Sequence, residues 1–392
     1  MRRSARLSVS VLAAVLAAIQ AAPTQTAEPA SPSKGLAASV QPFVDRQELA
    51  GAVMLVADNS RILDVEAVGW ADIAAKKPMR SDSMFWIASQ SKPITAAAMM
   101  LLVDEGKVKL DDPVEKYLPE FKGQMVVAEK DADHILLCKP RHPITIKNIL
   151  SHTSGLPFKS ALEEPTLDLL PLSARVRSYA MTPLDFEPDT KYAYSNAGIN
   201  TAGRVIEVVS HMPFETFLER RLLRPLEMSD TTFWPTPEQA ARIAKSYKPG
   251  PGNKGLVETP ITQLHYPLTD RAQRYPMPAG GLFSTAHDLA CFYQMLLGGG
   301  QWAGRRFLSE NAVRQLTSRQ TPPTLKESYG LGFGVGKNFF GHGGAYSTNS
   351  SADTGRGLIL IWLVQHAGFP GEGQKAQNAF AKAALDRFHA SR

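Results

Sequence analysis

The segments with strand character lie mainly near the two ends of this 392-residue chain, and this distribution constrains its fold more than any other feature. Runs typical of strands, bounded by turn residues, cover 51–57, 62–69, 330–336, 339–346 and 358–364. The middle is mostly helical by its apolar spacing, which predicts helices at 94–105, 111–117, 145–151, 172–180, 197–210, 213–223, 237–246 and 285–297. Strands at both ends predict one sheet assembled from distant parts of the chain.

The predicted fold class is α/β of the α+β type, with an antiparallel sheet flanked by helices and built from N- and C-terminal segments. We expect one domain over residues 36–392. Its sheet region takes about 36–88 and 280–392, and a mostly helical region, about 89–279, is inserted between them. A cleft is expected at the seam, because small-molecule sites tend to form at such junctions.

Three further elements complete this prediction. Amphipathic patterns predict short helices at 36–47 and 375–389, close to the two ends of the domain. Within the helical region, residues 124–128 and 134–138 predict a hairpin insertion.

The first residues have the layout of a secretory signal peptide. Residues 1–6 are basic and residues 7–22 are apolar and rich in alanine, too short for a membrane span. We therefore expect a signal peptide over 1–27 and a disordered linker over 28–35, rich in Pro, Ser and Ala. This predicts a periplasmic or secreted protein with no stable membrane insertion after cleavage, and a retained N-terminal anchor is the alternative.

The charge gives no sign of a nucleic-acid partner. The formal net charge of +6 falls to +3 without residues 1–22, which hold three arginines and no acid, and the remaining basic residues are scattered. Cys138 and Cys291 lie in apolar surroundings, which favours buried free thiols over a disulfide. The histidines form no H-E-x-x-H or comparable cluster, so we expect no metal site and no cofactor.

A candidate nucleophile lies where the helix predicted at 94–105 begins. Ser89 and Lys92 are three positions apart, just before Pro93, a residue favoured in the first turn of a helix. This spacing puts both side chains on one face, close enough to share a proton, and the helix dipole favours a developing negative charge there. A serine hydroxyl becomes nucleophilic when a neighbour takes its proton. Alternatively, Ser89 only caps the helix and Lys92 is solvated.

Tyr194 and Asn196 form a second candidate motif. They lie two apart in a turn-rich stretch, so their side chains can project the same way. A phenol serves as a general base if cations depress its pKa, and an asparagine amide can orient both a substrate and Lys92. The alternative is that Tyr194 is a buried aromatic residue that caps the next helix.

The third motif is His342-Gly343-Gly344. Glycines in a strand are unfavourable unless something approaches the backbone closely, and a bound substrate is one such reason. His342 would supply a donor or a titratable positive charge beside the site. The alternative is a tight turn with an exposed histidine.

The three motifs in this order resemble the serine β-lactamase and penicillin-binding protein superfamily. The resemblance is closest to its class C branch, which includes carboxylesterases and DD-peptidases, and it spans nearly all of residues 36–385. Further stretches that carry it are 150–157, 222–228 and 279–289.

The resemblance implies a role for each motif residue. Ser89 would be the acylated nucleophile, Lys92 its proton partner, and Tyr194 the base that passes the proton to the leaving group. Asn196 would orient the substrate. Which of Lys92 and Tyr194 takes the serine proton stays open, because the two titrate as a coupled set.

The resemblance also implies where the substrate binds. The backbone N–H groups of Ser89 and Ala345 would form the oxyanion hole, and His342 and Gly344 would bracket the substrate-binding strand.

The third motif departs from that branch, where class C β-lactamases typically carry Lys-Thr-Gly. A lysine is a permanent charge for a β-lactam carboxylate, whereas a histidine is only partly charged at neutral pH. We therefore expect an exported serine hydrolase that cleaves small-molecule or peptide-like esters or amides, of carboxylesterase or D-amino-acid peptidase or amidase type, with weak or no β-lactamase activity. The alternatives are a true class C-like β-lactamase, a DD-carboxypeptidase, and a catalytically silent scaffold.

One further stretch imitates a nucleophile motif. His152-Thr153-Ser154-Gly155 lacks the G-x-S-x-G spacing and follows a segment that is predicted to be helical, so we interpret it as structural.

Overall fold

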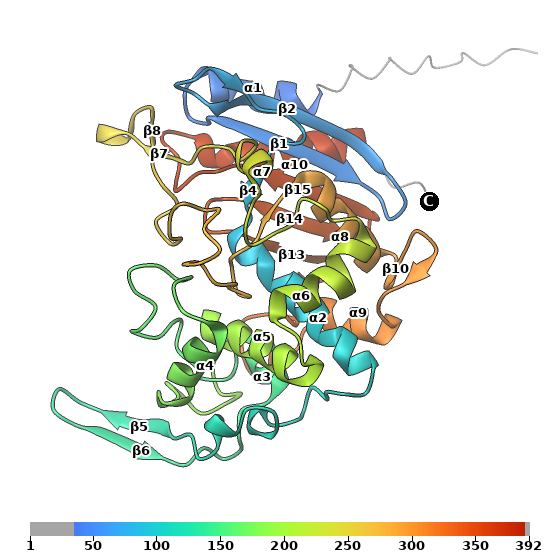
Figure 1. Ribbon diagram of the computed structural model, residues 1–392. Coiled ribbons are helices and arrows are strands. Elements are labelled where there is room, and N and C mark those ends of the chain that lie inside the picture. Colours follow the sequence, from blue (N-terminus) through green and yellow to red (C-terminus); the bar gives the residue numbers. More distant parts are fainter. Residues whose placement is uncertain (1–34, 389–392) are drawn as a thin grey trace, which may run out of the picture. The chain divides into compact units, whose positions relative to one another are not determined.

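A seven-stranded antiparallel sheet joins the two ends of the chain in the computed structural model, which describes residues 35–388 (Figure 1). The strand order is β12-β13-β14-β15-β1-β2-β3. Their bounds are β1 Gly51–Ala57, β2 Ile62–Asp72, β3 Lys77–Pro78, β12 Gly334–Gly336, β13 Phe339–Gly343, β14 Asn349–Asp353 and β15 Leu358–Leu363. The predicted fold class is confirmed. The expected signal peptide and, except for Gly35, the expected linker lie outside the described residues.

Strand β1 is the centre of this arrangement because both of its faces are covered. All seven of its residues are buried, and it pairs with β15 in the register Val53↔Leu363. Val53 and Leu55 belong to a core on one side of the sheet, while Met54 and Val56 belong to a core on the other. A strand buried on both faces has no polar alternation, which explains its continuous apolar sequence.

Helices cover the two faces of the sheet. The outer face carries α1 (Leu36–Asp45) and α10 (Ala376–Arg387), which pack against each other although they come from opposite ends of the domain (Figure 1). The inner face carries α8 (Ala286–Leu297), which contacts β1 and β15. Helix α2 (Ser91–Asp104) packs against α5 (Asn196–Ser210) and α9 (Glu310–Thr317) within the same inner core.

The inserted region is mostly helical. Its helices include α3 Ile146–Ser151, α4 Leu172–Ala180, α5 Asn196–Ser210, α6 Phe214–Leu218 and α7 Pro237–Ala240. Helix α9 Glu310–Thr317 lies outside this region, nearer the C-terminus. Four two-stranded sheets are β4 Phe85–Trp86 with β9 Phe283–Ser284, β5 Val126–Lys130 with β6 Ile135–Cys138, β7 Tyr247–Pro249 with β8 Leu256–Glu258, and β10 Gln301–Trp302 with β11 Arg305–Arg306. No helix among residues 35–388 is long and apolar enough to cross a membrane.

The predicted hairpin insertion forms, but one of its cysteines is not where we expected it. Strands β5 and β6 project from the helical region (Figure 1), and Cys138 at the end of β6 is exposed. The expectation of a buried Cys138 is therefore wrong. Cys291 in α8 is buried, and both thiols are free.

Several predicted elements are shorter than expected because backbone groups pair elsewhere. The strand predicted at 339–346 ends at Gly343, since the Ser347 N–H donates to the Gly344 carbonyl at 2.9 Å in a turn. In 111–117 only a 3₁₀ turn forms, Val114–Lys116, since the Val114 N–H donates to the Ile144 carbonyl at 2.9 Å. The helix predicted at 237–246 ends at Ala240, since residues 242–244 pair with Met84 through two backbone hydrogen bonds of 2.9 and 3.0 Å.

The strand predicted at 330–336 is confined to Gly334–Gly336. Gly332, with a φ of +74°, turns the chain and donates its N–H to the Leu150 carbonyl at 2.9 Å.

Strand β14 and helix α9 were not predicted. The β14 sequence Asn-Ser-Ser-Ala-Asp has low strand propensity, and it forms a strand because β13 and β15 satisfy its backbone on both sides.

Candidate active site

Ser89 lies in a 3₁₀ turn, Ala88–Gln90, that runs directly into α2. The turn is held from behind, because the Ile87 N–H donates to the Leu282 carbonyl at 3.0 Å. Ala88 has a φ of +45°, a left-handed conformation that costs about 1 kcal/mol in a residue with a Cβ. The strained residue Ala88 therefore precedes a partly exposed Ser89, whose hydroxyl a substrate can reach.

The Lys92 amine is completely buried and is held at three points. Its Nζ atom lies 3.0 Å from Ser89 Oγ, 2.8 Å from Asn196 Oδ1 and 2.8 Å from the Ala279 carbonyl oxygen. The predicted contact between Ser89 and Lys92 is therefore present, and the alternative of a solvated Lys92 is wrong.

Burial holds the pKa of Lys92 well below its usual value. Low polarity disfavours the ammonium form, and no carboxylate contributes to the shift. A neutral amine has two hydrogens for the Asn196 and Ala279 oxygens, which leaves its lone pair directed at the Ser89 hydroxyl. This arrangement suits a proton acceptor.

Tyr194 lies directly before the helix that supplies Asn196. The Ser195 hydroxyl accepts the Gly198 N–H at 3.0 Å, which starts α5 at Asn196 and points the amide at Lys92. The Lys92 Nζ atom lies 4.6 Å from the centre of the Tyr194 ring. Tyr194 and Asn196 thus both lie beside Lys92, as predicted.

The pKa of Tyr194 is raised rather than depressed. Burial is the largest cause, and a hydrogen bond with Ser89 opposes it only in part. A phenol serves as a general base only if cations depress its pKa, so Tyr194 does not meet this condition in the structure. A protonated Tyr194 beside Ser89 is suited to donate a proton.

His342 lies on β13 and is partly buried. Its Nδ1 lies 2.6 Å from the Gly343 carbonyl oxygen, and its Nε2 lies 2.9 Å from the Tyr329 hydroxyl and 3.4 Å from the Tyr194 hydroxyl. Burial is the largest cause that lowers the pKa of His342 to about 3, and the nearby Lys92 adds to this effect only when it is protonated. Of the two expected roles, a donor or a titratable positive charge, the lowered pKa argues against the charge at neutral pH.

Gly344 lets the end of β13 lie directly against the turn that holds Ser89. A Cβ at this position would lie 2.5 Å from the Ile87 carbonyl oxygen and would overlap the Thr348 hydroxyl. The close approach is therefore made by the protein itself, where we had expected a substrate. The next residue, Ala345, is exposed, and its N–H has no acceptor among the described residues, as an oxyanion donor requires.

The sequence did not indicate three further neighbours of the site. The Ala279 carbonyl binds Lys92. The rings of His152 and Tyr329 pack behind Tyr194, with centroids 4.5 Å apart for His152 and Tyr194 and 4.8 Å apart for His152 and Tyr329. Residues 329–333 read Tyr-Gly-Leu-Gly-Phe, an aromatic residue before glycines. Nothing in this stretch indicates that Tyr329 lies beside His342, which is a consequence of the fold.

The stretch that begins at His152 is structural, in agreement with its interpretation. His152 ends α3 in a left-handed conformation with a φ of 61°, and its Nδ1 accepts the Ser195 N–H at 3.1 Å. This bond fixes the residue between Tyr194 and Asn196, so His152 supports the site. Ser154, the serine of the stretch, is buried, and its hydroxyl accepts the Leu156 N–H at 3.2 Å. Burial holds the pKa of His152 well below the usual value.

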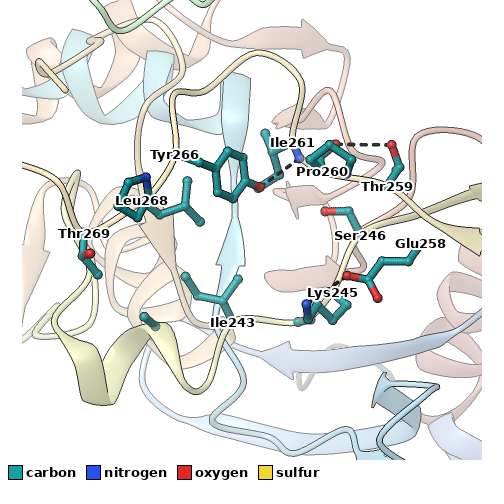
Figure 2. A pocket seen from close by; sticks show the side chains of 13 residues that line it. Ile243, Lys245, Ser246, Glu258, Thr259, Pro260, Ile261, Tyr266, Leu268 and Thr269 are labelled. Atoms are coloured by element: carbon teal, nitrogen blue, oxygen red, sulfur yellow. Dashed lines mark hydrogen bonds and ion pairs between the residues drawn. The ribbon is translucent and has the colours of Figure 1, made fainter. Parts of the chain in front are cut away.

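A separate pocket of about 560 Å³ lies outside this cluster (Figure 2). Figure 2 shows Tyr266 with its hydroxyl toward Ile261, whose N–H it accepts at 3.0 Å, and Lys245 beside Glu258. None of the predicted site residues lines it. Among residues 35–388, no group of three His, Cys, Asp or Glu side chains could hold a metal ion.

Comparisons with known proteins show the family of this chain. The family model described as Beta-lactamase matches residues 36–384. Protein Rv1367c of Mycobacterium tuberculosis is 32% identical over 366 residues, which cover 85% of this chain and 90% of that protein. Esterase EstB of Burkholderia gladioli is 31% identical over 265 residues, 62% of this chain and 64% of that protein.

A solved structure with the same fold is that of EstCE1, a hydrolase with promiscuous acyltransferase activity. It superimposes with a TM-score of 0.73 at 23% identity and covers 89% of this chain and 97% of that chain. The match to the family model covers nearly the whole described part of the chain. The chain therefore belongs to the beta-lactamase family, whose members are serine hydrolases that work through an acyl-enzyme.

Proposed function

We propose that the protein is an exported serine carboxylesterase that cleaves neutral esters through an acyl-enzyme on Ser89. One observation carries this proposal: the buried Lys92 Nζ lies 3.0 Å from Ser89 Oγ, and its other two contacts are oxygens that can accept the hydrogens of a neutral amine. The amine can therefore take the serine proton as the hydroxyl attacks.

Acylation needs one proton transfer and one new bond. The Ser89 Oγ bonds to the carbonyl carbon of the ester while its proton moves to the Lys92 lone pair. The carbonyl electron pair moves onto the carbonyl oxygen, where the N–H groups of Ser89 and Ala345 stabilise the negative charge. Lys92 is the acylation base in this proposal, because the pKa of Tyr194 is raised by burial.

Collapse of this intermediate releases the alcohol. The bond to the alkoxide breaks as the Tyr194 hydroxyl donates its proton to the leaving oxygen, and Tyr194 recovers a proton from Lys92. Water then attacks the acyl-enzyme with the same groups acting in reverse, which releases the carboxylic acid and restores Ser89.

The charge of His342 and the acidity of the Tyr194 hydroxyl both bear on the class of substrate. A neutral His342 supplies no charge for the carboxylate of a β-lactam or of a D-alanyl peptide terminus, so anionic substrates gain nothing from the third motif. A phenol with a raised pKa is a weak proton donor, which favours an alkoxide leaving group over an amine. The similarity to Esterase EstB supports the same choice.

A screen of the purified mature protein with p-nitrophenyl butyrate, a D-amino-acid amide and nitrocefin tests this function. We expect ester turnover that Ser89→Ala abolishes, together with a fluorophosphonate adduct on Ser89 seen by mass spectrometry. Faster amide turnover would favour the D-amino-acid peptidase or amidase alternative. Nitrocefin rates typical of β-lactamases would favour a true β-lactamase, and a lack of labelling would favour the silent scaffold.

Export is a separate part of this proposal and is supported by the basic and then apolar residues 1–22. Cell fractionation of the full chain checks it. Retention of the uncleaved chain in the cytoplasm would contradict it.

A further inference from the structure

His342 faces two hydroxyl groups but has one lone pair to offer them. A carbonyl oxygen only accepts, so the 2.6 Å contact with the Gly343 oxygen requires that Nδ1 carries the hydrogen. The neutral ring then accepts at Nε2 alone. The Tyr329 hydroxyl lies 2.9 Å from this atom and the Tyr194 hydroxyl 3.4 Å from it.

Tyr329 is the better placed of the two donors. Its side chain is 6% exposed, and His342 Nε2 is the one hydrogen-bond partner of its hydroxyl among the described residues. A buried hydroxyl without an acceptor costs about 1–3 kcal/mol, so Tyr329 retains this bond. The backbone holds it in place, because the Gln320 N–H donates to the Tyr329 carbonyl at 2.8 Å.

Tyr194 has a second use for its hydroxyl. Its ring lies beside Lys92, with 4.6 Å between Nζ and the ring centre, and the proposed reaction needs its proton at the leaving group on Ser89. If the Nε2 lone pair were free, the Tyr194 hydroxyl would need to move by only a few tenths of an ångström to donate there.

We propose that Tyr329 is a positioning residue: by donating to His342 Nε2 it occupies the lone pair and keeps the Tyr194 hydroxyl directed at Ser89 and the leaving group. This inference rests on the proposed function, because it gives Tyr194 the role of proton donor. Tyr329 itself contacts no reacting atom in this account.

The first test compares Tyr329→Phe with Tyr192→Phe. The Tyr192 ring packs near Tyr329, with centroids 5.7 Å apart, but its hydroxyl makes no hydrogen bond with any described residue. We expect Tyr329→Phe to lower kcat for ethyl butyrate, whose alkoxide leaving group needs a proton donor, about 10-fold with little change in KM, as loss of a group that acts in the transition state does. Tyr192→Phe should keep the wild-type kcat.

A double-mutant cycle with His342→Phe shows whether Tyr329 acts through His342. We expect Tyr329→Phe to cause no further loss of kcat in the His342→Phe protein, because the lone pair is then absent. Independent losses that multiply would overturn the inference, as would a wild-type kcat for Tyr329→Phe. Tyr329→Met, which also lacks a donor, replaces the Phe variant if that protein does not fold.

The same assays separate this inference from the proposed function. If Ser89→Ala retains full ester turnover, the proposed function is wrong and the role of Tyr329 falls with it. If Ser89→Ala is inactive while Tyr329→Phe matches the wild type, only the role of Tyr329 is wrong.

Discussion

The Lys92 Nζ atom lies 2.8 Å from Asn196 Oδ1, and this contact joins α2 to α5 across 104 residues of sequence. The asparagine oxygen accepts a hydrogen from the amine whether or not the amine is protonated, so it positions Lys92 without fixing its charge. An aspartate in the same place would position Lys92 and would also stabilise its charged form.

Asn196→Asp should shift the activity toward alkaline pH. A carboxylate beside Lys92 favours the ammonium form and raises the pKa that burial holds low, so less free amine is present at neutral pH. The acid limb of the profile of kcat/KM against pH should move up by at least one unit. The measurement is ester hydrolysis from pH 5 to 10, and an unchanged limb would contradict a neutral Lys92 as the base.

Lys92→Met should separate activity from folding. The variant lacks a proton acceptor, and we expect kcat to fall by about 10³-fold, within the usual range for general-base groups. The site is completely buried, so an unbranched apolar side chain of similar length should fit there. Thermal unfolding should show a Tm within a few degrees of the wild type, and a Tm that collapses would assign Lys92 a structural role.

His342→Lys should change the preference between substrates. A lysine brings a positive charge that can pair with the carboxylate of nitrocefin, whereas the neutral ester gains nothing from it. We expect the ratio of kcat/KM for nitrocefin to that for p-nitrophenyl butyrate to rise about 10-fold, the value of one charge-assisted contact. An unchanged ratio would show that the third motif does not set this preference.

Gly344→Ala should destabilise the protein and separate β13 from the turn that holds Ser89. The new Cβ would lie 2.5 Å from the Ile87 carbonyl oxygen, so the strand must shift at a cost of about 1–3 kcal/mol in the free energy of unfolding. Gly343→Ala is the matched control, because the nearest atoms to its Cβ would be 3.5 Å away. Chemical denaturation of both variants measures the difference, and equal losses would contradict the close approach at Gly344.

The sequence predicted the parts of the site that depend on local order. Ser89 and Lys92 share a helix start, and Tyr194 and Asn196 lie two residues apart just before the next predicted helix, so their spacing was enough to pair them. The architecture followed in the same way from strands at both ends of the chain.

The charges in the site could not be predicted because they depend on packing. His342 and Tyr194 have pKa values set by burial among rings from other segments, including His152 and Tyr329. No local pattern marks Ala279 either, because its backbone carbonyl contributes and its side chain does not. Strand β14 has the same origin, since its neighbours and not its own residues make it a strand.

The pairing of Val53 with Leu363 has a consequence for how the chain is made. The central strand β1 gains one of its two neighbours only when a segment some 300 residues further on has left the ribosome. Contacts of such high sequence separation form late and slowly, so the nascent chain cannot complete its core during synthesis. Until the C-terminal strands are synthesised, the sheet and its core stay incomplete. For most of its translation the polypeptide can therefore pass through a narrow channel in an extended form.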